Sequence, residues 1–459
     1  LKLSKDLRER YEKETEIHRL IDMAKQVEGM PRNASTHAAG VVITDQPVDS
    51  YVPLAKNNDA VVTQFTMTTL EELGLLKMDF LGLRNLSVID NTEKLIRQTN
   101  PEYSMQCMSV EDKAVYEMLA RGETEGVFQF ESAGMRSVIM QLKPEHMEDL
   151  IAVISLYRPG PMDSIPKYIN NRHHPEQVRY HHPLLEPILN VTYGCIVYQE
   201  QVMQIFRTLA GYSLGRADIV RRAMSKKKGD VMEREKQIFL YGLTREDGTV
   251  EVEGCLRRGV SESVAKTIFH EMESFASYAF NKSHAAAYAM VAYETAYLKC
   301  HYPQQYMASL LTSVLDSTNK VVSYIGDCTR MGIAVLPPYV NDSNATFTPV
   351  GKDIRFGLLA VKNLGKGFID ALVRERQEHG KFQTFYQFCK RMYPIDLNRR
   401  ALESLILCGA MDGLGEGYNR KQMLSAIPEV LSILEDDKRR NVEGQIGFFD
   451  APGEEEQQG

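Results

Sequence analysis

The chain has 459 residues, of which 43% are hydrophobic and 25% charged, and its formal net charge at pH 7 is −7. This composition is ordinary for a folded, water-soluble protein and excludes the disordered and collagen-like classes. At the usual size of roughly 100 to 200 residues per domain, the length allows about two to four domains. The negative net charge does not favour a general nucleic-acid binder, so such binding requires a local basic patch.

The cysteines and the apolar segments indicate the compartment. The seven cysteines lie far apart and form no Cys-x-x-Cys pair, which argues against a zinc site and against a disulfide framework. The longest apolar run, AAAYAMVAY, is shorter than the roughly 18 residues of a membrane span, and the chain opens with the charged LKLSKDLRER rather than a signal peptide. We therefore expect a cytoplasmic protein with no membrane partner. Because the first residue is leucine, we expect an upstream part to be missing.

Hydrophobic periodicity predicts a mixed chain. Residues 1–28 have helical spacing with many charges, whereas residues 41–83 alternate as strands do. Residues 85–339 predict mostly helices, interrupted by stretches rich in proline and glycine, and the pair Pro337-Pro338 predicts a domain boundary. A second compact region is expected over residues 341–417.

An otherwise apolar run, LGLLKMDFLGL, contains two opposite charges, Lys77 and Asp79. Residues two apart on a strand point to the same side, so Leu76, Met78 and Phe80 are expected to pack on the other side. A carboxylate on a rigid strand suits a divalent cation, and a neighbouring ammonium suits a phosphate. The same pattern also fits a surface ion pair on a half-exposed strand.

The densest basic patch, GRADIVRRAMSKKK, runs from Gly215 to Lys228 and holds six cations and one acid. Arg222 lies one helical turn before Lys226, so the patch predicts a cationic helix face suited to polyphosphate or to a nucleic-acid backbone. A solvated helix end is the other interpretation.

The segment FNKSHAAAY predicts a helix capped by Asn281 or Ser283. Such a cap would place Lys282 and His284 beside free backbone N–H groups at the positive end of the helix, where a phosphate binds well. Tyr278 adds an aromatic ring just before it. The alternative is a histidine whose hydrogen bonds are satisfied by a neighbour.

The segment LGKGFIDALVRER predicts the hairpin of a helix-hairpin-helix unit. Gly365 and Gly367 would let the backbone approach a DNA phosphate closely, and the helix that follows would offer its N-terminus near Lys366. A Gly-x-Gly pair is also common in ordinary turns.

The C-terminal segment predicts a helix near residues 419–433, then the charged linker LEDDKRRNVEGQ and a disordered tail that ends in PGEEEQQG. Within it, Gln445, Phe448 and Phe449 place adjacent aromatic residues in a polar stretch that cannot use them in a core. Exposed aromatic residues in a linker are typical of a docking peptide.

Together these segments resemble the alpha subunits of bacterial DNA polymerase III, the C-family replicative polymerases. The resemblance extends over nearly the whole chain and depends on many motifs in the family's order: RNASTHAAGVVIT, VTQF, GLLKMDFLGLRNL, VFQFES, SLYRPGP, TYGCIVYQEQVMQI, RRAMSKKK, FNKSHAAAYA and LNRRALESLILCGAMD.

The resemblance implies a mainly helical α+β fold with a small portion of the palm sheet, large helical fingers and a helix-hairpin-helix region. The implied domains are the end of the thumb over 1–36, the C-terminal part of the palm over 37–85, the fingers over 86–340, the helix-hairpin-helix DNA-binding region over 341–425, and a linker with a clamp-binding motif and disordered tail over 426–459.

The reaction that the resemblance implies is nucleotidyl transfer, in which a primer 3'-hydroxyl attacks the α-phosphate of a deoxynucleoside triphosphate and pyrophosphate leaves. Asp79 matches one of three catalytic aspartates that hold two Mg²⁺ ions, and Lys77 matches a lysine that faces the nucleotide phosphates. The positions that match the nucleotide site in the fingers are Arg221, Arg222, Tyr278 and His284. Lys282 joins them from the helix cap, and Arg158 of YRPGP and His37 also fall in family motifs.

The resemblance also implies partners. Gly365, Lys366 and Gly367 would contact primer-template DNA, and the motif from Gln445 to Phe449 resembles the family's binding peptide for the sliding clamp. An exonuclease subunit and a clamp loader are further expected partners.

One departure from the family pattern is the absence of any Asp-x-Asp pair, which carries the other two catalytic aspartates. We therefore expect an incomplete segment that is inactive alone. A rival interpretation is a non-catalytic module that binds DNA and tethers the clamp. A third is a phosphoesterase with a histidine and carboxylate metal cluster, for which the dense histidines are His173, His174, His181 and His182, in a loop without acidic partners at metal spacing.

Overall fold

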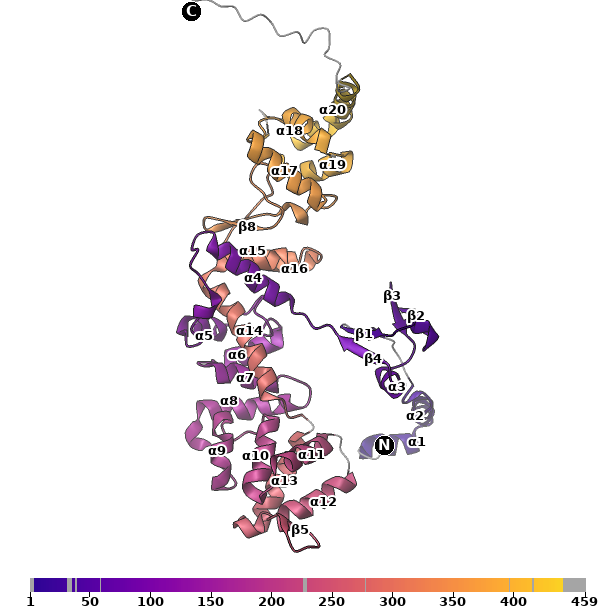
Figure 1. Cartoon of the computed structure of the whole chain (residues 1–459), viewed down its shortest axis with the longest axis vertical. Coiled ribbons are helices and arrows are strands. Elements are labelled where there is room, and N and C mark those ends of the chain that lie inside the picture. Colours follow the sequence, from indigo (N-terminus) through magenta and orange to yellow (C-terminus); the bar gives the residue numbers. More distant parts are fainter. Residues whose placement is uncertain are drawn as a thin grey trace, which may run out of the picture. The chain divides into compact units, whose positions relative to one another are not determined.

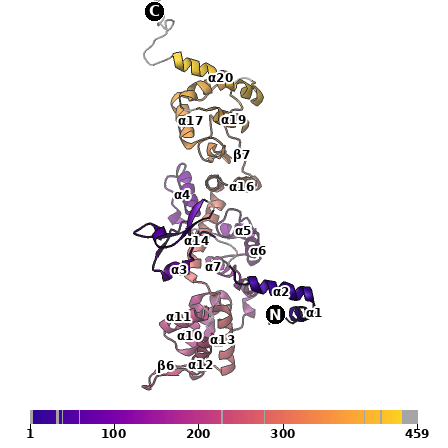
Figure 2. The same cartoon turned by 90° about the vertical axis from the view of Figure 1, so that its right-hand side faces the viewer.

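The computed structural model describes residues 4–30, 35–37, 39–57, 59–225, 229–276, 278–395, 397–414 and 417–440. The chain forms two compact units, Leu1–Leu83 and Arg84–Gly459. Each unit is described by itself, and Figures 1 and 2 label their elements.

The first unit combines helices with two small antiparallel ribbons (Figure 1). Its helices are α1 (Lys5–Lys13), α2 (Thr15–Val27) and α3 (Met67–Glu72), and its strands are β1 (Gly40–Ile43), β2 (Leu54–Asn57), β3 (Ala60–Thr63) and β4 (Leu76–Asp79). Strand β1 pairs with β4, and β2 pairs with β3. The register of the first ribbon sets Gly40 opposite Asp79 and Val42 opposite Lys77.

The β1–β4 ribbon has one polar face and one apolar face, as strand alternation requires. Val41 lies opposite Met78, and Ile43 lies opposite Leu76, so these four side chains share the apolar face. Within the described residues this face is exposed, since Leu76 is 58% and Met78 is 44% accessible, and Phe80 next to the strand is 65% accessible. The expectation that Leu76, Met78 and Phe80 pack in a core is therefore wrong for the described part of the chain.

The second unit is mainly helical. Its helices before the C-terminal region are α4 (Arg84–Arg97), α5 (Lys113–Ala120), α6 (Ala133–Leu142), α7 (Met147–Leu156), α8 (Ile165–His173), α9 (Glu186–Leu189), α10 (Gln199–Ala210), α11 (Leu214–Ser225), α12 (Gly229–Tyr241), α13 (Glu262–Ala276), α14 (Lys282–His301), α15 (Pro303–Thr312) and α16 (Thr318–Arg330). A short antiparallel hairpin, β5 (Leu243–Thr244) with β6 (Val250–Val252), follows α12.

Helix α14 is the central element of this unit and runs beside α7 (Figures 1 and 2). Ala285, Ala289, Ala292 and Ala296 are fully buried and form one stripe at helical spacing. These small side chains let neighbouring helices approach α14 closely. One core cluster gathers residues of α5, α6, α7, α8 and α14, and a second gathers residues of α10, α11, α12 and α13. Helices α4, α15 and α16 contribute to another.

The C-terminal region begins with a three-stranded sheet in the order β7-β9-β8. Its elements are β7 (Val335–Leu336), β8 (Thr348–Val350), β9 (Asp353–Arg355), α17 (Lys366–His379), α18 (Phe385–Met392), α19 (Arg399–Leu407) and α20 (Arg420–Arg440). The helices enclose their own hydrophobic core.

The structure confirms the expected fold class, a mainly helical α+β chain with small sheets. Two local expectations are wrong. Residues 67–72 form α3 rather than strand, and the helix expected near 419–433 continues to Arg440, so the first part of the expected linker is helical. The limits of thumb, palm and fingers remain predictions. No helix in the described ranges is long and apolar enough to cross a membrane.

Candidate functional site

Lys77 and Asp79 form an ion pair on the polar face of the β1–β4 ribbon. Because the two residues are two apart on β4, they point to the same side of the ribbon. The ammonium Nζ of Lys77 lies 2.6 Å from Oδ1 of Asp79, and the Lys77 side chain is 16% exposed whereas that of Asp79 is 41% exposed. The carboxylate is thus held by a rigid strand and open to solvent.

Gly40 gives His37 and Asp79 room to converge. A Cβ atom at Gly40 would lie 2.9 Å from Nδ1 of His37 and 3.2 Å from Oδ1 of Asp79. Nδ1 of His37 accepts hydrogen bonds from the backbone N–H groups of Ala39, at 3.1 Å, and Gly40, at 2.6 Å. The chain between His37 and β1 is therefore folded tightly around this imidazole.

The electrostatics of this group favour an ionised Asp79. The hydrogen bond from Lys77 lowers the pKa of the Asp79 carboxyl, and the charge of Lys77 lowers it further. A cavity of about 400 Å³ opens on the same unit, lined by Lys77, His37 and Ser35 together with apolar side chains such as Val42 and Leu54.

The basic patch on α11 is more neutralised than its sequence indicates. Arg216 turns inward and pairs with Glu235, at 2.8 Å, and Glu251, at 2.7 Å. Arg221 and Arg222 both pair with Asp218, at 2.7 and 2.8 Å. The Arg221 side chain is 13% exposed and that of Arg222 is 70% exposed, so Arg222 is the more accessible cation. The lysines at 226–228 lie outside the described residues.

The cap of α14 forms as expected, but its N–H groups are not free. The Asn281 side chain accepts the N–H of His284 at 2.9 Å, and the Glu200 carboxylate accepts the N–H of Lys282 at 3.1 Å. The ammonium of Lys282 lies 3.1 Å from Oε1 of Glu148. The expected free N–H groups beside Lys282 and His284 are therefore not those of these two residues, because a carboxylate 82 residues away accepts the first and the Asn281 side chain accepts the second.

Arg158 binds the segment before α14. Its guanidinium donates to the carbonyl of Tyr278 at 2.7 Å and to that of Ser155 at 3.1 Å, and lies 4.1 Å from the ring centroid of Phe280. Burial lowers the pKa of Arg158. Gly160 lies under the Tyr278 ring, since a Cβ atom there would come within 2.4 Å of it.

His284 lies between two aromatic rings. Its ring centroid is 5.3 Å from that of Phe280, edge to face, and 4.4 Å from that of Tyr288. Within the second unit the structure thus brings Arg158, Tyr278 and His284 to one place, and Lys77 and Asp79 form their own pair in the first unit.

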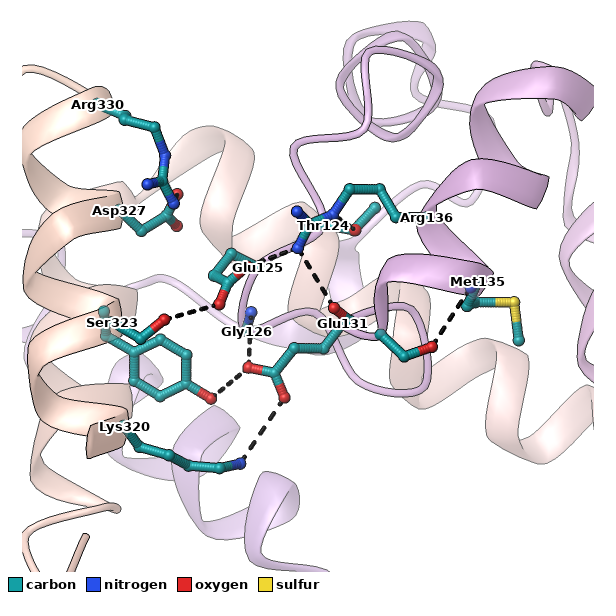
Figure 3. A network of polar contacts seen from close by, with 12 residues as sticks. Thr124, Glu125, Gly126, Glu131, Met135, Arg136, Lys320, Ser323, Asp327 and Arg330 are labelled. Atoms are coloured by element: carbon teal, nitrogen blue, oxygen red, sulfur yellow. Dashed lines mark hydrogen bonds and ion pairs between the residues drawn. The ribbon is translucent and has the colours of Figure 1, made fainter. Parts of the chain in front are cut away.

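A polar network that the sequence did not reveal joins α16 to the loop before α6 (Figure 3). Tyr324 donates to Glu131 at 2.6 Å, and Ser323 donates to Glu125 at 3.0 Å. Arg136 donates to the same Glu125 at 2.5 Å. The sequence feature that could have pointed to this network is the motif VFQFES, which contains Glu131.

A buried ion pair lies beside this network. The ammonium of Lys299 on α14 is 2.6 Å from Oδ2 of Asp327 on α16, and it also donates to the carbonyl of Glu125 at 2.7 Å. The Lys299 side chain is 1% exposed and that of Asp327 is 8% exposed. Arg330 adds a second cation, 3.1 Å from the same carboxylate (Figure 3). A lone lysine in the apolar stretch AYLKC was its sequence signal.

The predicted hairpin glycines lie at the start of α17. Gly365 is the N-cap, and the helix begins at Lys366, so Gly367 belongs to its first turn. Apart from their chain neighbours and the backbone of α17, no atom of the described residues lies within 4 Å of a Cβ placed at Gly365 or Gly367, so both positions are open. Lys366 pairs with Asp370 at 2.6 Å. The predicted clamp-binding residues Gln445, Phe448 and Phe449 lie outside the described residues.

The dense histidines have other partners. His181 lies 3.0 Å from Glu271, and His173 contacts the carbonyl of Gln141 at 3.0 Å. Across the described ranges, no group of three or more His, Cys, Asp or Glu side chains is placed to hold a metal ion. The phosphoesterase interpretation therefore gains nothing from these residues.

Three family models match successive parts of the chain. Residues 1–82 match the bacterial DNA polymerase III alpha NTPase domain, residues 85–247 match the bacterial DNA polymerase III alpha subunit finger domain, and residues 332–423 match a helix-hairpin-helix motif. A DNA polymerase III subunit alpha of Thermus aquaticus is 44% identical over 451 residues, which is 97% of this chain and 36% of that protein.

The chain belongs to the family of bacterial DNA polymerase III alpha subunits. A DNA polymerase III subunit alpha of Staphylococcus aureus is 43% identical over 432 residues, which is 94% of this chain and 39% of that protein. The chain thus spans between 36% and 39% of the length of these relatives. Within the matched ranges, Lys77 and Asp79 fall in the first domain, Arg158, Arg221 and Arg222 in the fingers, and Gly365 to Gly367 in the helix-hairpin-helix motif.

Proposed function

We propose that this chain is part of a DNA-directed DNA polymerase that elongates a primer by nucleotidyl transfer during replication. The observation that carries the proposal is the pair of Lys77 and Asp79, an exposed carboxylate and an ammonium 2.6 Å apart on one strand of a chain from this family. The reaction joins the primer 3'-hydroxyl to the α-phosphate of a deoxynucleoside triphosphate and releases pyrophosphate.

Asp79 is proposed as one ligand of a two-Mg²⁺ centre. Its exposure and its lowered pKa suit a metal ligand, but Mg²⁺ needs about six oxygen ligands and no cluster of three candidate ligands occurs in the ranges that the structure describes. The donor set is therefore partial, and further carboxylates would have to come from elsewhere. When bound, such ions stabilise the attacking and leaving oxygens. Lys77 holds the carboxylate ionised and lies next to the place where a phosphate would arrive.

Arg158, Tyr278 and His284 are proposed to bind the incoming nucleotide. Arg158 is partly buried and has no carboxylate partner in the described part of the chain, so its charge is available to a polyphosphate. Tyr278 is 39% exposed and offers a ring to a base or sugar. The imidazole nitrogens of His284 have no hydrogen-bond partner among the described residues, so the nitrogen that carries the proton can donate to a phosphate oxygen.

Three further cations are proposed for the same ligand. Arg221 and Arg222 both pair with the Asp218 carboxylate, and the Arg222 side chain is 70% exposed, so a phosphate can reach its guanidinium. Lys282 would have to leave Glu148 before it could contact a phosphate. Neutralising Arg221 and Arg222 should weaken nucleotide use more than duplex binding, whereas the reverse result would assign the pair to the DNA backbone.

The C-terminal region is proposed to bind primer-template DNA. Gly365, Lys366 and Gly367 lie at an open helix N-terminus, where a phosphate can approach the backbone. We also propose that Gln445, Phe448 and Phe449 bind a sliding clamp, and that an exonuclease subunit and a clamp loader assemble with the complete enzyme in the cytoplasm. Replacing both phenylalanines by alanine should abolish clamp binding and leave nucleotide binding unchanged.

The rival function is a non-catalytic module that binds DNA and tethers the clamp. The absence of an Asp-x-Asp pair from the 459 residues favours this rival for the chain alone, and we propose that the isolated chain extends no primer. A chimera separates the two functions. The matching region of the Thermus aquaticus relative is replaced by this chain, and primer extension is measured with Mg²⁺ and deoxynucleotides. Extension at a rate similar to the relative supports the polymerase, whereas DNA binding without extension supports the rival.

A further inference from the structure

The imidazole of His284 contacts two aromatic rings, and residues from distant segments of the chain contact these rings in turn. Tyr288 stands one helical turn after His284 on α14, and Phe280 lies just before the N-cap residue Asn281. The Phe280 ring meets His284 edge to face at an interplanar angle of 78°, and the Tyr288 ring is tilted by 33° against it. Aromatic pairs in these geometries attract each other beyond their buried area.

The rings of Phe280 and Tyr288 have further contacts that restrict their movement. The guanidinium of Arg158 lies 4.1 Å from the centroid of Phe280, and the ring of Phe128 lies 5.4 Å from that of Tyr288. The backbone of Phe280 is also fixed, since its N–H donates to the carbonyl of Val197 at 3.2 Å and its carbonyl accepts the N–H of Gln199 at 2.9 Å. The flanking rings are partly buried against the core, whereas His284 is exposed.

We propose that Phe280 and Tyr288 are positioning residues that hold the His284 imidazole in one orientation, ready to donate to a phosphate of the incoming nucleotide. This inference rests on the proposed function of His284. An exposed side chain normally loses rotamer freedom when it binds, and a ring held in advance avoids that cost. Because the two rings also pack against the core, orientation of His284 and folding are measured separately.

The test uses substitutions of Tyr288 in the chimera with the Thermus aquaticus relative. Tyr288→Phe keeps the ring, and Tyr288→Leu keeps an apolar side chain but removes the ring. We expect Tyr288→Leu to raise KM for the deoxynucleotide about two- to tenfold with little change in affinity for primer-template, and Tyr288→Phe to behave as the unaltered protein. Met290→Leu, at an exposed position on the same helix, is the matched control and should change neither value.

A double-substitution cycle tests whether Tyr288 acts through His284. In a His284→Ala background, Tyr288→Leu should have no further effect on KM, because there is no imidazole left to orient. Equal effects of Tyr288→Leu in both backgrounds would overturn the inference. If His284→Ala alone leaves KM unchanged, His284 does not bind the nucleotide and the proposed function of this residue is wrong. If His284→Ala raises KM but Tyr288→Leu acts equally in both backgrounds, only the positioning role of Tyr288 is wrong.

A readout independent of activity uses the full chain with isotope-labelled histidine. The imidazole signal of His284, assigned from its loss in His284→Ala, reports ring motion by NMR relaxation. We expect this ring to become more mobile in Tyr288→Leu and to stay rigid in Tyr288→Phe. An imidazole that is equally rigid in both variants would contradict the positioning role.

Discussion

Gly160 leaves the space that the ring of Tyr278 occupies: a Cβ atom at residue 160 would lie 2.4 Å from two carbons of that ring. Gly160 also has φ of 105°, which disfavours any other residue. Gly160→Ala should therefore displace Tyr278 and raise KM for the deoxynucleotide in the chimera. Gly332→Ala is the matched control, because Gly332 has φ of 73° and no atom within 4 Å of its Cβ position. Equal nucleotide KM values in the two variants would show that the Tyr278 ring does not contribute to binding.

The buried pair of Lys299 and Asp327 should matter for stability. Lys299→Met leaves the Asp327 carboxylate buried with Arg330 as its remaining cation, so we expect the full chain to lose about 3 kcal/mol in free energy of unfolding. Lys320→Met is the control, because its ion pair with Glu131 is 3.8 Å long and exposed, and it should change stability by about 1 kcal/mol or less. Urea unfolding followed by circular dichroism measures both, and similar losses would refute the special role of Lys299.

Asp79 should titrate at lower pH when Lys77 is present. The Lys77 hydrogen bond is the largest cause of the lowered Asp79 pKa, and the charge of Lys77 is a smaller one. Because the carboxyl pKa is depressed, the ion pair between Lys77 and Asp79 is present at neutral pH and is lost as the pH falls through that pKa. In Lys77→Met the Asp79 pKa should rise toward its ordinary value. Carboxyl NMR titration of the full chain measures this, and an unchanged pKa in Lys77→Met would contradict it.

The open positions at α17 allow a test of DNA contact without a change in folding. Apart from its chain neighbours and the backbone of α17, no atom of the described residues lies within 4 Å of a Cβ at Gly365, so Gly365→Ala should cost about 1 kcal/mol or less, the preference for glycine over alanine at an N-cap. If the backbone there approaches a DNA phosphate, the added methyl group should weaken binding of primer-template several-fold. Gly326→Ala, on α16, is the control, because the nearest atom found to its Cβ position among the described residues is Nη1 of Arg330 at 3.9 Å. Equal affinity of both variants in fluorescence anisotropy would remove Gly365 from the DNA-binding surface.

Local patterns in the sequence predicted local geometry well. Strand alternation placed Lys77 and Asp79 on one side, and FNKSH predicted a helix capped by Asn281 or Ser283, of which the structure has Asn281. Contacts between distant segments were not predictable. Glu200 reaches the N–H of Lys282 across 82 residues, and Arg158 reaches the carbonyl of Tyr278 across 120 residues. Sequence periodicity does not predict these long-range contacts, because they depend on how several helices pack together.

The sequence also did not predict whether the apolar face of β4 is buried. Alternation shows that Leu76 and Met78 share a face, but whether that face is covered depends on which other segment packs there. Within the described part of the basic patch, Arg216 departs from the prediction for a related reason. Arg216 belongs to the same run as Arg221 by sequence, yet the fold turns it toward Glu235 and Glu251. Charge counts in a sequence therefore overstate the cationic face of α11.

The central claim is that the Asp79 carboxylate serves nucleotidyl transfer. The most direct measurement is single-turnover incorporation of one deoxynucleotide by the chimera, with Mg²⁺ and saturating primer-template, in Asp79→Asn and in the control Asp49→Asn, an exposed aspartate of the same unit. Loss of a metal ligand should lower the rate about 100-fold or more in Asp79→Asn while DNA affinity and the control stay unchanged. Incorporation by Asp79→Asn at the rate of the unaltered chimera would contradict the assignment.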